Sequence, residues 1–434
     1  MAPVTRERHA AAEVLRAVSR GRRLDRALEQ ATTELQDRER RWTQEAAYGT
    51  VRLRGRLDHL LDTHLRKGLS SLSLLLLDLI RLGAYQVLYM DGVPAYAAIS
   101  QTVNQVRRVA GDGGARLANG VLRSLEREGG SPERFPSFSR APQDHLATWG
   151  SHPRWLLRRW LSRWDPEEVR VLVEWNNTLP PVHLRPLGID LPEAGRRLAR
   201  EGIGAEPVGD GIPCLRLAAG TDPATALRQV PGIVQDPGAA LASLYVDPPT
   251  GVRVADLCAA PGGKALALAH AGAYVLAADP SPGRAGLLRD NVRRVGGPVD
   301  VVVARAQAPP LREAEMVLLD VPCSGTGTLR RHPDGRWRLT PELIRDLSAL
   351  QREILEGAVP LVPKGGHLVY ATCTLEEEEN REQVERFLSR HPGFRIRETG
   401  AVAPRFLDEP GTLRVLPHHV GYDGAFGARM ERVS

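Results

Sequence analysis

The stretch Asp256-Leu257-Cys258-Ala259-Ala260-Pro261-Gly262-Gly263-Lys264 decides the fold class. It follows an apolar run of strand length, so it lies where a strand ends and a helix begins. Small residues there let the backbone approach a ligand closely, and exposed amides at a helix N-terminus favour an anionic or polar group. The spacing is not that of a dinucleotide fingerprint, and Cys258 replaces the first glycine of a P-loop. Taken alone, the stretch is also compatible with a tight turn that binds nothing.

Around this turn, short apolar runs alternate with longer amphipathic stretches. The runs of strand length are 252–256, 274–278, 299–303, 316–320 and 367–371. Strands that alternate with helices predict a mostly parallel α/β sheet covered on both faces. An oxidoreductase that uses a nucleotide cofactor is disfavoured, because the glycine fingerprint is missing.

Two helices can be placed after the fourth strand. Thr340 is the expected N-cap of a helix with Pro341 at its first position. Its apolar stripe is predicted to be core rather than a binding surface, and consists of Leu343, Ile344, Leu347, Leu350 and Ile354. A second helix is predicted over 375–390, and Glu376 to Glu379 in its first turn suit the helix dipole.

The N-terminal part of the chain has a different pattern. Apolar residues recur at three- and four-residue spacing from Arg6 to about Arg127, which predicts a bundle of short helices. A Gly/Pro/Ser cluster at 129–142 is typical of a linker. We therefore predict a helical domain over 1–135, a small α+β linker subdomain over 145–234 and the α/β domain over 235–434.

Composition and charge narrow the class of protein. The 434 residues include four cysteines with no metal-ligand spacing, so neither a disulfide framework nor a metal site is expected. Residues 1–140 hold 23 Lys and Arg against 16 Asp and Glu, a basic balance that suits a polyanionic partner but is also ordinary solvation. The most hydrophobic stretch, 72–90, is interrupted by Asp78 and Arg81, so we expect no membrane-spanning helix and a cytoplasmic protein.

Two predicted strands deliver a cysteine just beyond their carboxyl ends. Asp320 is followed by Cys323, and the strand ending near Ala371 is followed by Cys373. Open α/β sheets bind ligands at this edge, where Asp279 also follows its strand and suits a ribose hydroxyl. Buried, inert cysteines are the usual alternative. The shared position of the two thiols beside Asp320 favours a reactive pair.

These motifs resemble the RNA (cytosine-5) methyltransferases of the NOL/NSUN/Sun group, and within it the bacterial branch that acts on 16S ribosomal RNA. The resemblance extends over nearly the whole chain, and residues 1–127 resemble a NusB-type helical domain. The stretches that carry it are Cys258 to Lys264, Asp320 to Ser324, Arg330 to Asp334 with Trp337, Tyr370 to Cys373, Leu416 to His419, Asp423 to Phe426, His152 to Leu156, Asn176-Asn177 with Pro180-Pro181, and Val234 to Asp236.

The resemblance implies a chemistry for each catalytic side chain. Cys373 takes the position of the nucleophile that adds to carbon 6 of cytosine, and Cys323 that of the group that assists release of the product. Asp320 is expected at the amino edge of the base. Lys264 either assists there, contacts the cofactor or caps the helix.

The resemblance also implies the cofactor and its ligands. The methyl donor is S-adenosylmethionine, and the binding residues it implies are Cys258, Ala259, Ala260, Pro261, Gly262, Gly263, Lys264, Asp279 and Asp320. Arg284 either contributes to this site or is a surface arginine. The partner implied is RNA, with no metal, no membrane and a monomeric chain, and the N-terminal and linker domains either bind RNA or only pack.

One departure from the family pattern concerns the adenine. Arg305, within Ala304-Arg305-Ala306-Gln307, stands where the family has an acid that contacts the adenine. A backbone amide or another side chain replaces the acid, the affinity is lower, or the loop is shifted. The alternative function is a non-catalytic RNA-binding or ribosome-assembly factor with a degenerate cofactor site.

Overall fold

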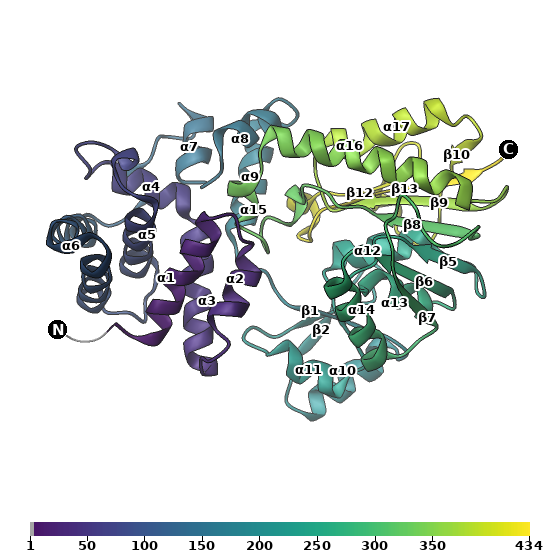
Figure 1. Ribbon diagram of the computed structural model, residues 1–434, viewed down its shortest axis with the longest axis horizontal. Coiled ribbons are helices and arrows are strands. Elements are labelled where there is room, and N and C mark those ends of the chain that lie inside the picture. The colour runs from purple at the N-terminus through teal and green to yellow at the C-terminus, as the bar shows by residue number, and fades with distance from the viewer. Residues whose placement is uncertain (1–3) are drawn as a thin grey trace. The chain divides into compact units, whose positions relative to one another are not determined.

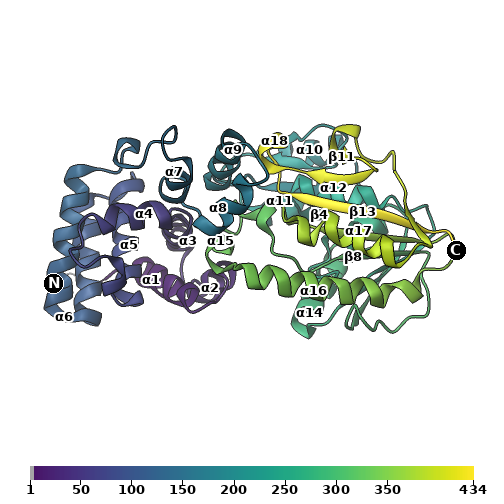
Figure 2. The same ribbon diagram turned by 90° about the horizontal axis from the view of Figure 1, so that it is seen from above.

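The structure is a computed structural model that describes residues 4–434. It divides into two compact units (Figures 1 and 2). The helical unit comprises residues 4–178 and 329–338, and the α/β unit comprises 179–328 and 339–434. Each unit is described separately below.

The helical unit contains only helices among its described residues, as the pattern over 6–127 predicts. Its helices are α1 (Arg6–Ser19), α2 (Leu24–Ala31), α3 (Asp37–Arg52), α4 (Arg54–Asp62), α5 (Leu74–Tyr89), α6 (Ala95–Glu128), α7 (Pro142–Thr148), α8 (Arg154–Leu161), α9 (Pro166–Asn177) and α15 (Gly335–Arg338), with 3-10 turns at Leu69–Ser71 and Pro132–Arg134. Helix α6 is interrupted at Gly111, whose φ of 64° is left-handed. The unit extends to residue 178, whereas the sequence places a boundary between 135 and 145; that boundary stays a prediction.

Residues 329–338 belong to the helical unit although the chain on both sides belongs to the α/β unit. The Trp337 indole N–H donates to the Val51 carbonyl at 2.8 Å. Asp334, which is buried, accepts the backbone N–H of Leu24 at 3.2 Å. This inserted segment is therefore held by polar contacts to α2 and α3.

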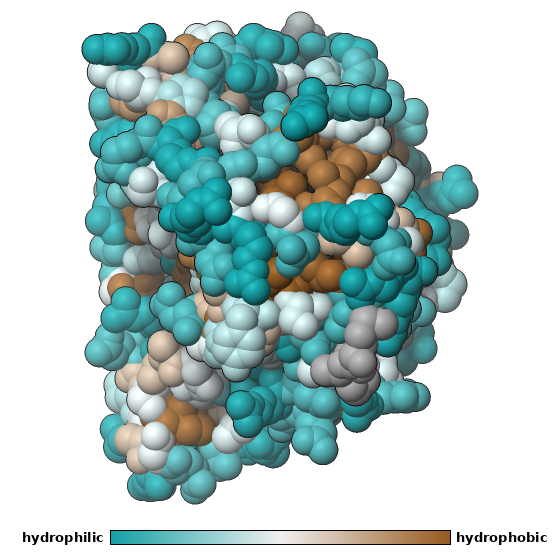
Figure 3. Space-filling model, turned by 90° about the vertical axis from the view of Figure 1, so that its left-hand side faces the viewer, coloured by the Kyte–Doolittle hydropathy of each residue, from teal (hydrophilic) through white to brown (hydrophobic). Residues whose placement is uncertain are grey.

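Figure 3 shows the face of the molecule on the side where α5 and α6 lie in Figure 1. This face is mostly hydrophilic and carries an apolar patch. Large exposed apolar side chains on these helices are Leu74, Tyr96 and Val109. Within residues 4–434, no helix is long and apolar enough to cross a membrane.

The α/β unit begins with a small antiparallel sheet of order β2-β3-β1-β4. The elements of this part are β1 (His183–Pro186), α10 (Leu191–Arg200), β2 (Ala205–Pro207), β3 (Leu215–Leu217), α11 (Pro223–Gln229) and β4 (Gly232–Val234). Leu184, Leu198 and Leu215 are among the side chains that form its core.

The large sheet has the strand order β11-β12-β13-β9-β8-β5-β6-β7, with β10 paired to β13. The five strands from β9 to β7 are parallel to their neighbours, as the sequence predicts. Their bounds are β5 (Arg253–Asp256), β6 (Tyr274–Asp279), β7 (Val299–Val303), β8 (Met316–Asp320) and β9 (His367–Thr372). The order reverses between β5 and β8, and such a switch point opens a crevice at the carboxyl ends of the strands.

Helices cover both faces of this sheet (Figure 1). They are α12 (Pro237–Val246), α13 (Gly263–His270), α14 (Pro282–Val295), α16 (Pro341–Ala358), α17 (Arg381–Arg390) and α18 (Pro417–Val420). Alternate strand residues face opposite cores: Leu318 lies in the core with α12 to α14, and Leu319 in the core with α16 and α17. The predicted cap of α16 is confirmed, since the Thr340 side chain accepts the N–H of Leu343.

The structure differs from the sequence prediction in three places. The C-terminal strands β10 (Phe394–Ile396), β11 (Leu407–Asp408), β12 (Thr412–Val415) and β13 (Ala425–Arg432) add antiparallel pairs that the alternation did not indicate. The helix predicted over 375–390 begins only at Arg381, after a 3-10 turn at Glu377–Glu379. In the stripe of α16, Leu343 is 38% exposed and is not core.

Candidate active site

Two neighbouring strand ends carry the predicted cysteines. Strands β8 and β9 are parallel and in register, with Asp320 opposite Ala371. The chain leaves both strands at the same edge, and the Val321 N–H donates to the Ala371 carbonyl at 3.1 Å. Cys323 and Cys373 therefore follow their strands side by side.

The two thiols are in direct contact. The Sγ atoms of Cys323 and Cys373 lie 3.4 Å apart, and the Cys373 backbone N–H donates to the Cys323 sulfur. The hydrogen bond to Cys373, together with burial, raises the pKa of the Cys323 thiol well above its ordinary value. Cys323 thus holds its proton more tightly than an ordinary thiol does.

An ion pair lies beside the thiols. The Lys264 ammonium donates to Asp320 Oδ2 at 2.7 Å. Burial acts to lower the pKa of Lys264, but the Asp320 carboxylate outweighs it and Cys373 adds to the effect, so the pKa is raised. Lys264 is therefore a positive charge paired with the Asp320 carboxylate.

Asp256, at the end of β5, is a buried group to which the sequence assigned no role. Burial, reinforced by Asp320, raises the pKa of Asp256 to about 7. Its Oδ1 accepts only the Cys258 N–H, at 3.4 Å, and its Oδ2 has no hydrogen-bond partner. Strand β5 therefore ends in a carboxyl group whose charge changes near neutral pH. The sequence pattern did not indicate that this carboxyl group is buried.

The glycine-rich turn comes close to α14. Gly262 has a φ of +108°, and a Cβ there would lie 2.4 Å from Leu288 Cδ1. Arg284, on α14, donates to the Ala260 carbonyl at 2.6 Å and lies 3.1 Å from Asp279 Oδ2. Arg284, whose side chain is 53% exposed, thus contacts two predicted cofactor ligands, and its part in cofactor binding stays a prediction.

One cavity of about 560 Å³ brings these elements together. It is lined by Cys258, Ala260, Asp279, Pro280, Ser281, Arg284, Arg305, Ala306, Gln307, Asp320, Val321, Pro322, Cys323, Leu350, Ile354 and Cys373. Five of the predicted site residues do not line it: Ala259, Pro261, Gly262, Gly263 and Lys264. A volume of this size suits a cofactor-sized ligand.

The cavity wall contains residues that the sequence placed elsewhere. Leu350 and Ile354 line it, although Ile354 is buried in the core with α17 and Leu350 packs against that core. The prediction that they are core is confirmed, and this end of the stripe also borders the cavity. Arg305 and Gln307 line the same cavity as Asp279. The loop without the family's acid therefore still borders the cavity.

Polar residues behind the cysteines were also missed. Ser324 and Thr374, one position after each cysteine, join through their hydroxyls at 2.6 Å. Glu379, which the sequence assigned to a solvated helix start, is fully buried and accepts hydrogen bonds from both. The adjacent position of a hydroxyl residue after each cysteine was the only local signal of this network.

A parallel sheet of this order, a glycine-rich turn after its first strand and a paired-thiol cavity at the switch point define a Rossmann-like methyltransferase domain. Family models match three parts of the chain: 16S rRNA methyltransferase RsmB/F over residues 243–431, the NusB family over 5–127, and an RsmF/B-like ferredoxin-like domain over 152–223. Ribosomal RNA small subunit methyltransferase B of Yersinia pseudotuberculosis is 32% identical, with 97% of each chain covered. The protein of the same description from Pectobacterium carotovorum is 33% identical over the same shares. The chain belongs to the RsmB/F family of 16S rRNA methyltransferases, which confirms the predicted resemblance, and it is an S-adenosylmethionine-dependent RNA methyltransferase rather than a non-catalytic factor.

Solved structures support the same fold. The crystal structure of PH0851 aligns with a TM-score of 0.80 at 26% identity and covers 99% of both chains. NSun6 from Pyrococcus horikoshii, solved with SFG, aligns with a TM-score of 0.55 at 19% identity over 65% of this chain and 98% of its own. The predicted fold class, a helical domain followed by a linker domain and a Rossmann-like domain, is thereby confirmed.

Proposed function

We propose that this chain methylates carbon 5 of a cytosine in 16S ribosomal RNA, with Cys373 as the nucleophile and Cys323 as the residue that assists release. The contact of 3.4 Å between the two thiols, inside a cavity that also holds Asp320, carries the proposal. If one cysteine adds to the cytosine ring and the other assists its release, both sulfurs must reach the same base. The contact between the two thiols supports this requirement.

Carbon 5 of cytosine is a weak nucleophile, so the ring must be activated first. A bond from the Cys373 sulfur to carbon 6 converts carbon 5 into an enamine carbon. The thiolate is the reactive form of a cysteine, and Cys373 interacts electrostatically with Lys264. The Asp320 carboxylate, held by Lys264, can accept a hydrogen bond from the amino edge of the base.

Release requires that the proton on carbon 5 leaves and that the bond from sulfur to carbon 6 breaks. Cys323 lies in contact with Cys373 and keeps its proton, because its pKa is raised. As the bond from sulfur to carbon 6 breaks, the Cys323 thiol can give its proton to the departing Cys373 sulfur and take up the proton that leaves carbon 5, so that both cysteines end as thiols. The base must leave any stack to reach this cavity.

The residues present fit the methyl donor. The close turn at Gly262 excludes a Cβ, and the buried Asp256 Oδ2, at the end of the strand before this turn, has no hydrogen-bond partner. We propose that the backbone of Cys258 to Lys264 holds the amino-acid end, with Asp279 at the ribose and Arg305 with Gln307 beside the adenine. When bound, S-adenosylmethionine supplies an electrophilic methyl group.

The test is the formation of 5-methylcytosine in 16S ribosomal RNA by the purified protein with S-adenosylmethionine, measured by mass spectrometry of the nucleosides. Cys373→Ala is expected to abolish the product, because no ring activation occurs. Cys323→Ala is expected to accumulate a covalent protein–RNA adduct that survives denaturing electrophoresis. Product formed equally by Cys373→Ala would overturn the proposal, and an adduct that needs Cys323 instead of Cys373 would reverse the roles.

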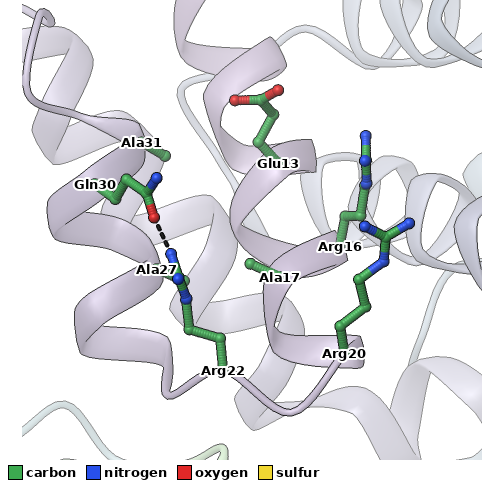
Figure 4. A pocket seen from close by; sticks show the side chains of 8 residues that line it. All are labelled: Glu13, Arg16, Ala17, Arg20, Arg22, Ala27, Gln30 and Ala31. Carbon is green, nitrogen blue, oxygen red and sulfur yellow. Dashed lines mark hydrogen bonds between the residues drawn. The ribbon is translucent and has the colours of Figure 1, made fainter.

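We extend the proposal to RNA binding by the helical unit. A cavity of about 530 Å³ between α1 and α2 is lined by Arg16, Arg20 and Arg22 (Figure 4). The Arg22 side chain donates to Gln30, and Glu13 is the one acid that lines the cavity. Three guanidinium groups at one groove favour contacts to phosphate oxygens.

We place the protein in the cytoplasm as a monomer. Two close thiols that must stay reduced suit a reducing compartment. The proposed active site is complete in one chain, since every residue assigned to the chemistry or to the methyl donor lies in the α/β unit.

A further inference from the structure

Glu379 is a buried acid that the mechanism above does not use. It lies in the 3-10 turn Glu377–Glu379, before α17, and its relative exposure is 0%. The sequence pattern indicates no role for it beyond the helix dipole. A carboxyl group at full burial is rare unless other groups hold it.

Four hydrogen-bond donors point at this one carboxyl group. Oε1 accepts the Ser324 backbone N–H at 2.9 Å and the Gln351 side-chain amide at 2.9 Å. Oε2 accepts the Thr374 hydroxyl at 3.1 Å and the Ser324 hydroxyl at a shorter distance. The Ser324 and Thr374 hydroxyls also lie 2.6 Å from each other, and each has a single proton, so the two hydroxyls and Oε2 form one shared hydrogen-bond network.

The charge has no cation among these partners. Burial raises the pKa of Glu379, and the hydrogen bonds from Ser324, Gln351 and Thr374 act against this rise. The Glu379 backbone carbonyl adds a further tie, because it accepts the Tyr370 hydroxyl at 2.6 Å. The carboxylate is therefore held by neutral dipoles alone.

These partners come from both cysteine-bearing loops. Ser324 directly follows Cys323, and Thr374 directly follows Cys373. A single carboxylate thus bridges the two loops one residue away from each sulfur, while Gln351 fixes it to α16. Other contacts also join the two loops: the thiols touch each other, the Gly327 N–H donates to the Cys373 carbonyl at 3.1 Å, and the Thr326 hydroxyl lies 3.0 Å from that of Thr374. Among these contacts, the Glu379 carboxylate is the one that binds the residue directly after each cysteine at the same time.

We propose that Glu379 is a positioning residue, whose carboxylate ties Ser324 to Thr374 and thereby keeps the thiols of Cys323 and Cys373 in contact. The inference rests on the proposed two-cysteine function. Without this tie the two residues after the cysteines shift, and the step that needs both sulfurs slows, while the binding of the methyl donor is unchanged.

The first experiment measures the thiol geometry without any catalysis. Diamide takes two hydrogens from a pair of close thiols, so that a disulfide forms and the diazene is reduced to the hydrazine. In the full chain without RNA, peptide mass spectrometry follows the Cys323–Cys373 disulfide over time. Glu379→Gln should slow its formation about 10-fold or more, since the amide presents two N–H groups to donors and shifts the loops.

Glu377→Gln is the matched control, because Glu377 lies in the same turn and is only half-buried. It should form the disulfide at the wild-type rate. Glu379→Asp keeps the charge but shortens the reach, so it should fall between wild type and Glu379→Gln, and it serves if Glu379→Gln does not fold. Equal rates in wild type and Glu379→Asp, with Glu379→Gln either equal or unfolded, would overturn the inference.

The second experiment separates positioning from general damage. Glu379→Gln should lower kcat about 10- to 100-fold, as expected for a small displacement of reacting groups. The KM for S-adenosylmethionine and its Kd by calorimetry should stay within about twofold of wild type. The variant should also retain the covalent RNA adduct, whose release slows. If a rise in the Kd for S-adenosylmethionine accounted for the whole loss of activity, Glu379 would have a general structural role and the inference would be wrong. If Cys373 proves dispensable for methylation, the proposed function fails, whereas the disulfide rates still decide the role of Glu379.

Discussion

Glu379 in the α/β unit and Arg336 in the helical unit are both charges buried among neutral partners. Arg336 donates to the carbonyls of Ser151 at 3.1 Å and Asn176 at 3.1 Å, and to the Asn177 side chain at 2.7 Å. Burial lowers the pKa of Arg336 well below its ordinary value. The two buried charges join different parts of the chain. Glu379 joins the loops that carry the reacting sulfurs, whereas Arg336 joins the inserted segment 329–338 to residues at the ends of other helices. What a buried charge contributes therefore depends on which segments its partners belong to.

The largest effect on stability is expected at Arg336. Arg336→Met leaves several buried carbonyl groups without a donor, so the free energy of unfolding of the helical unit should fall by about 3–5 kcal/mol. Urea unfolding followed by hydrogen exchange within residues 4–178 measures it. Arg26→Met, which removes an exposed pair with Glu29, is the control and should change the value by less than about 0.5 kcal/mol. A loss at Arg336 no larger than the control would break the comparison.

The second effect separates two buried carboxyl groups of the α/β unit. Asp256 has one long hydrogen bond where Glu379 has four, and burial raises the pKa of Asp256 to about 7. Lys264 acts to lower this pKa, and Asp320 and Asp279 act to raise it. Because the unfolded carboxyl has a pKa of about 4, folding favours its protonated form, so this contribution is fully present below pH 4 and is lost as the pH rises toward 7.

Asp256→Asn should remove that dependence. Between pH 5 and pH 8, the free energy of unfolding of the wild type should fall more than that of the variant, by about 2–3 kcal/mol. Urea unfolding at a series of pH values, followed by a probe in the α/β unit, gives both slopes. Parallel slopes would mean that Asp256 stays ionised in the folded protein.

A smaller effect is expected for Asp334, two positions before Arg336. Asp334 accepts the Leu24 N–H at 3.2 Å and the Arg338 Nε–H at 2.8 Å, both of which survive in part when the carboxylate becomes an amide. Asp334→Asn should lower the free energy of unfolding by about 1–2 kcal/mol and leave kcat unchanged. A fall in kcat without loss of stability would show that the inserted segment acts on the reaction, as Glu379 is proposed to do.

The sequence predicted those parts of the molecule that depend on neighbours in the chain. The strands at 299–303 and 316–320 have the predicted bounds, and Thr340 caps α16 as expected. Parallel strands also bring their carboxyl ends together by rule, which located both cysteines at one edge.

The parts that depend on distant partners were not predictable in this way. Glu379 binds Ser324, 55 positions away, and Gln351, 28 positions away, so a run of four acids looked like a solvated helix start. Leu350 and Ile354 keep a core-like period although one side of them faces a cavity. Period and propensity report that a side chain is apolar or acidic, and only the packed structure decides what it faces.

Exposed arginines on the helical unit should show the smallest effect on stability and so sharpen the contrast with Arg336. Arg16→Gln, Arg20→Gln and Arg22→Gln together should change the free energy of unfolding by less than about 0.5 kcal/mol, because water already solvates these groups. Their combined loss should weaken binding of 16S ribosomal RNA about 10-fold at low salt and flatten the dependence of log K on log salt by about 0.7 for each phosphate contact removed. Arg123→Gln with Arg127→Gln on α6 is the control for a general loss of positive charge. An equal change in affinity and salt slope in both sets would assign RNA binding to net charge instead of the groove between α1 and α2. A change confined to the first set would show that the helical unit uses arginine in two ways, with buried Arg336 stabilising the fold and exposed Arg16 binding RNA.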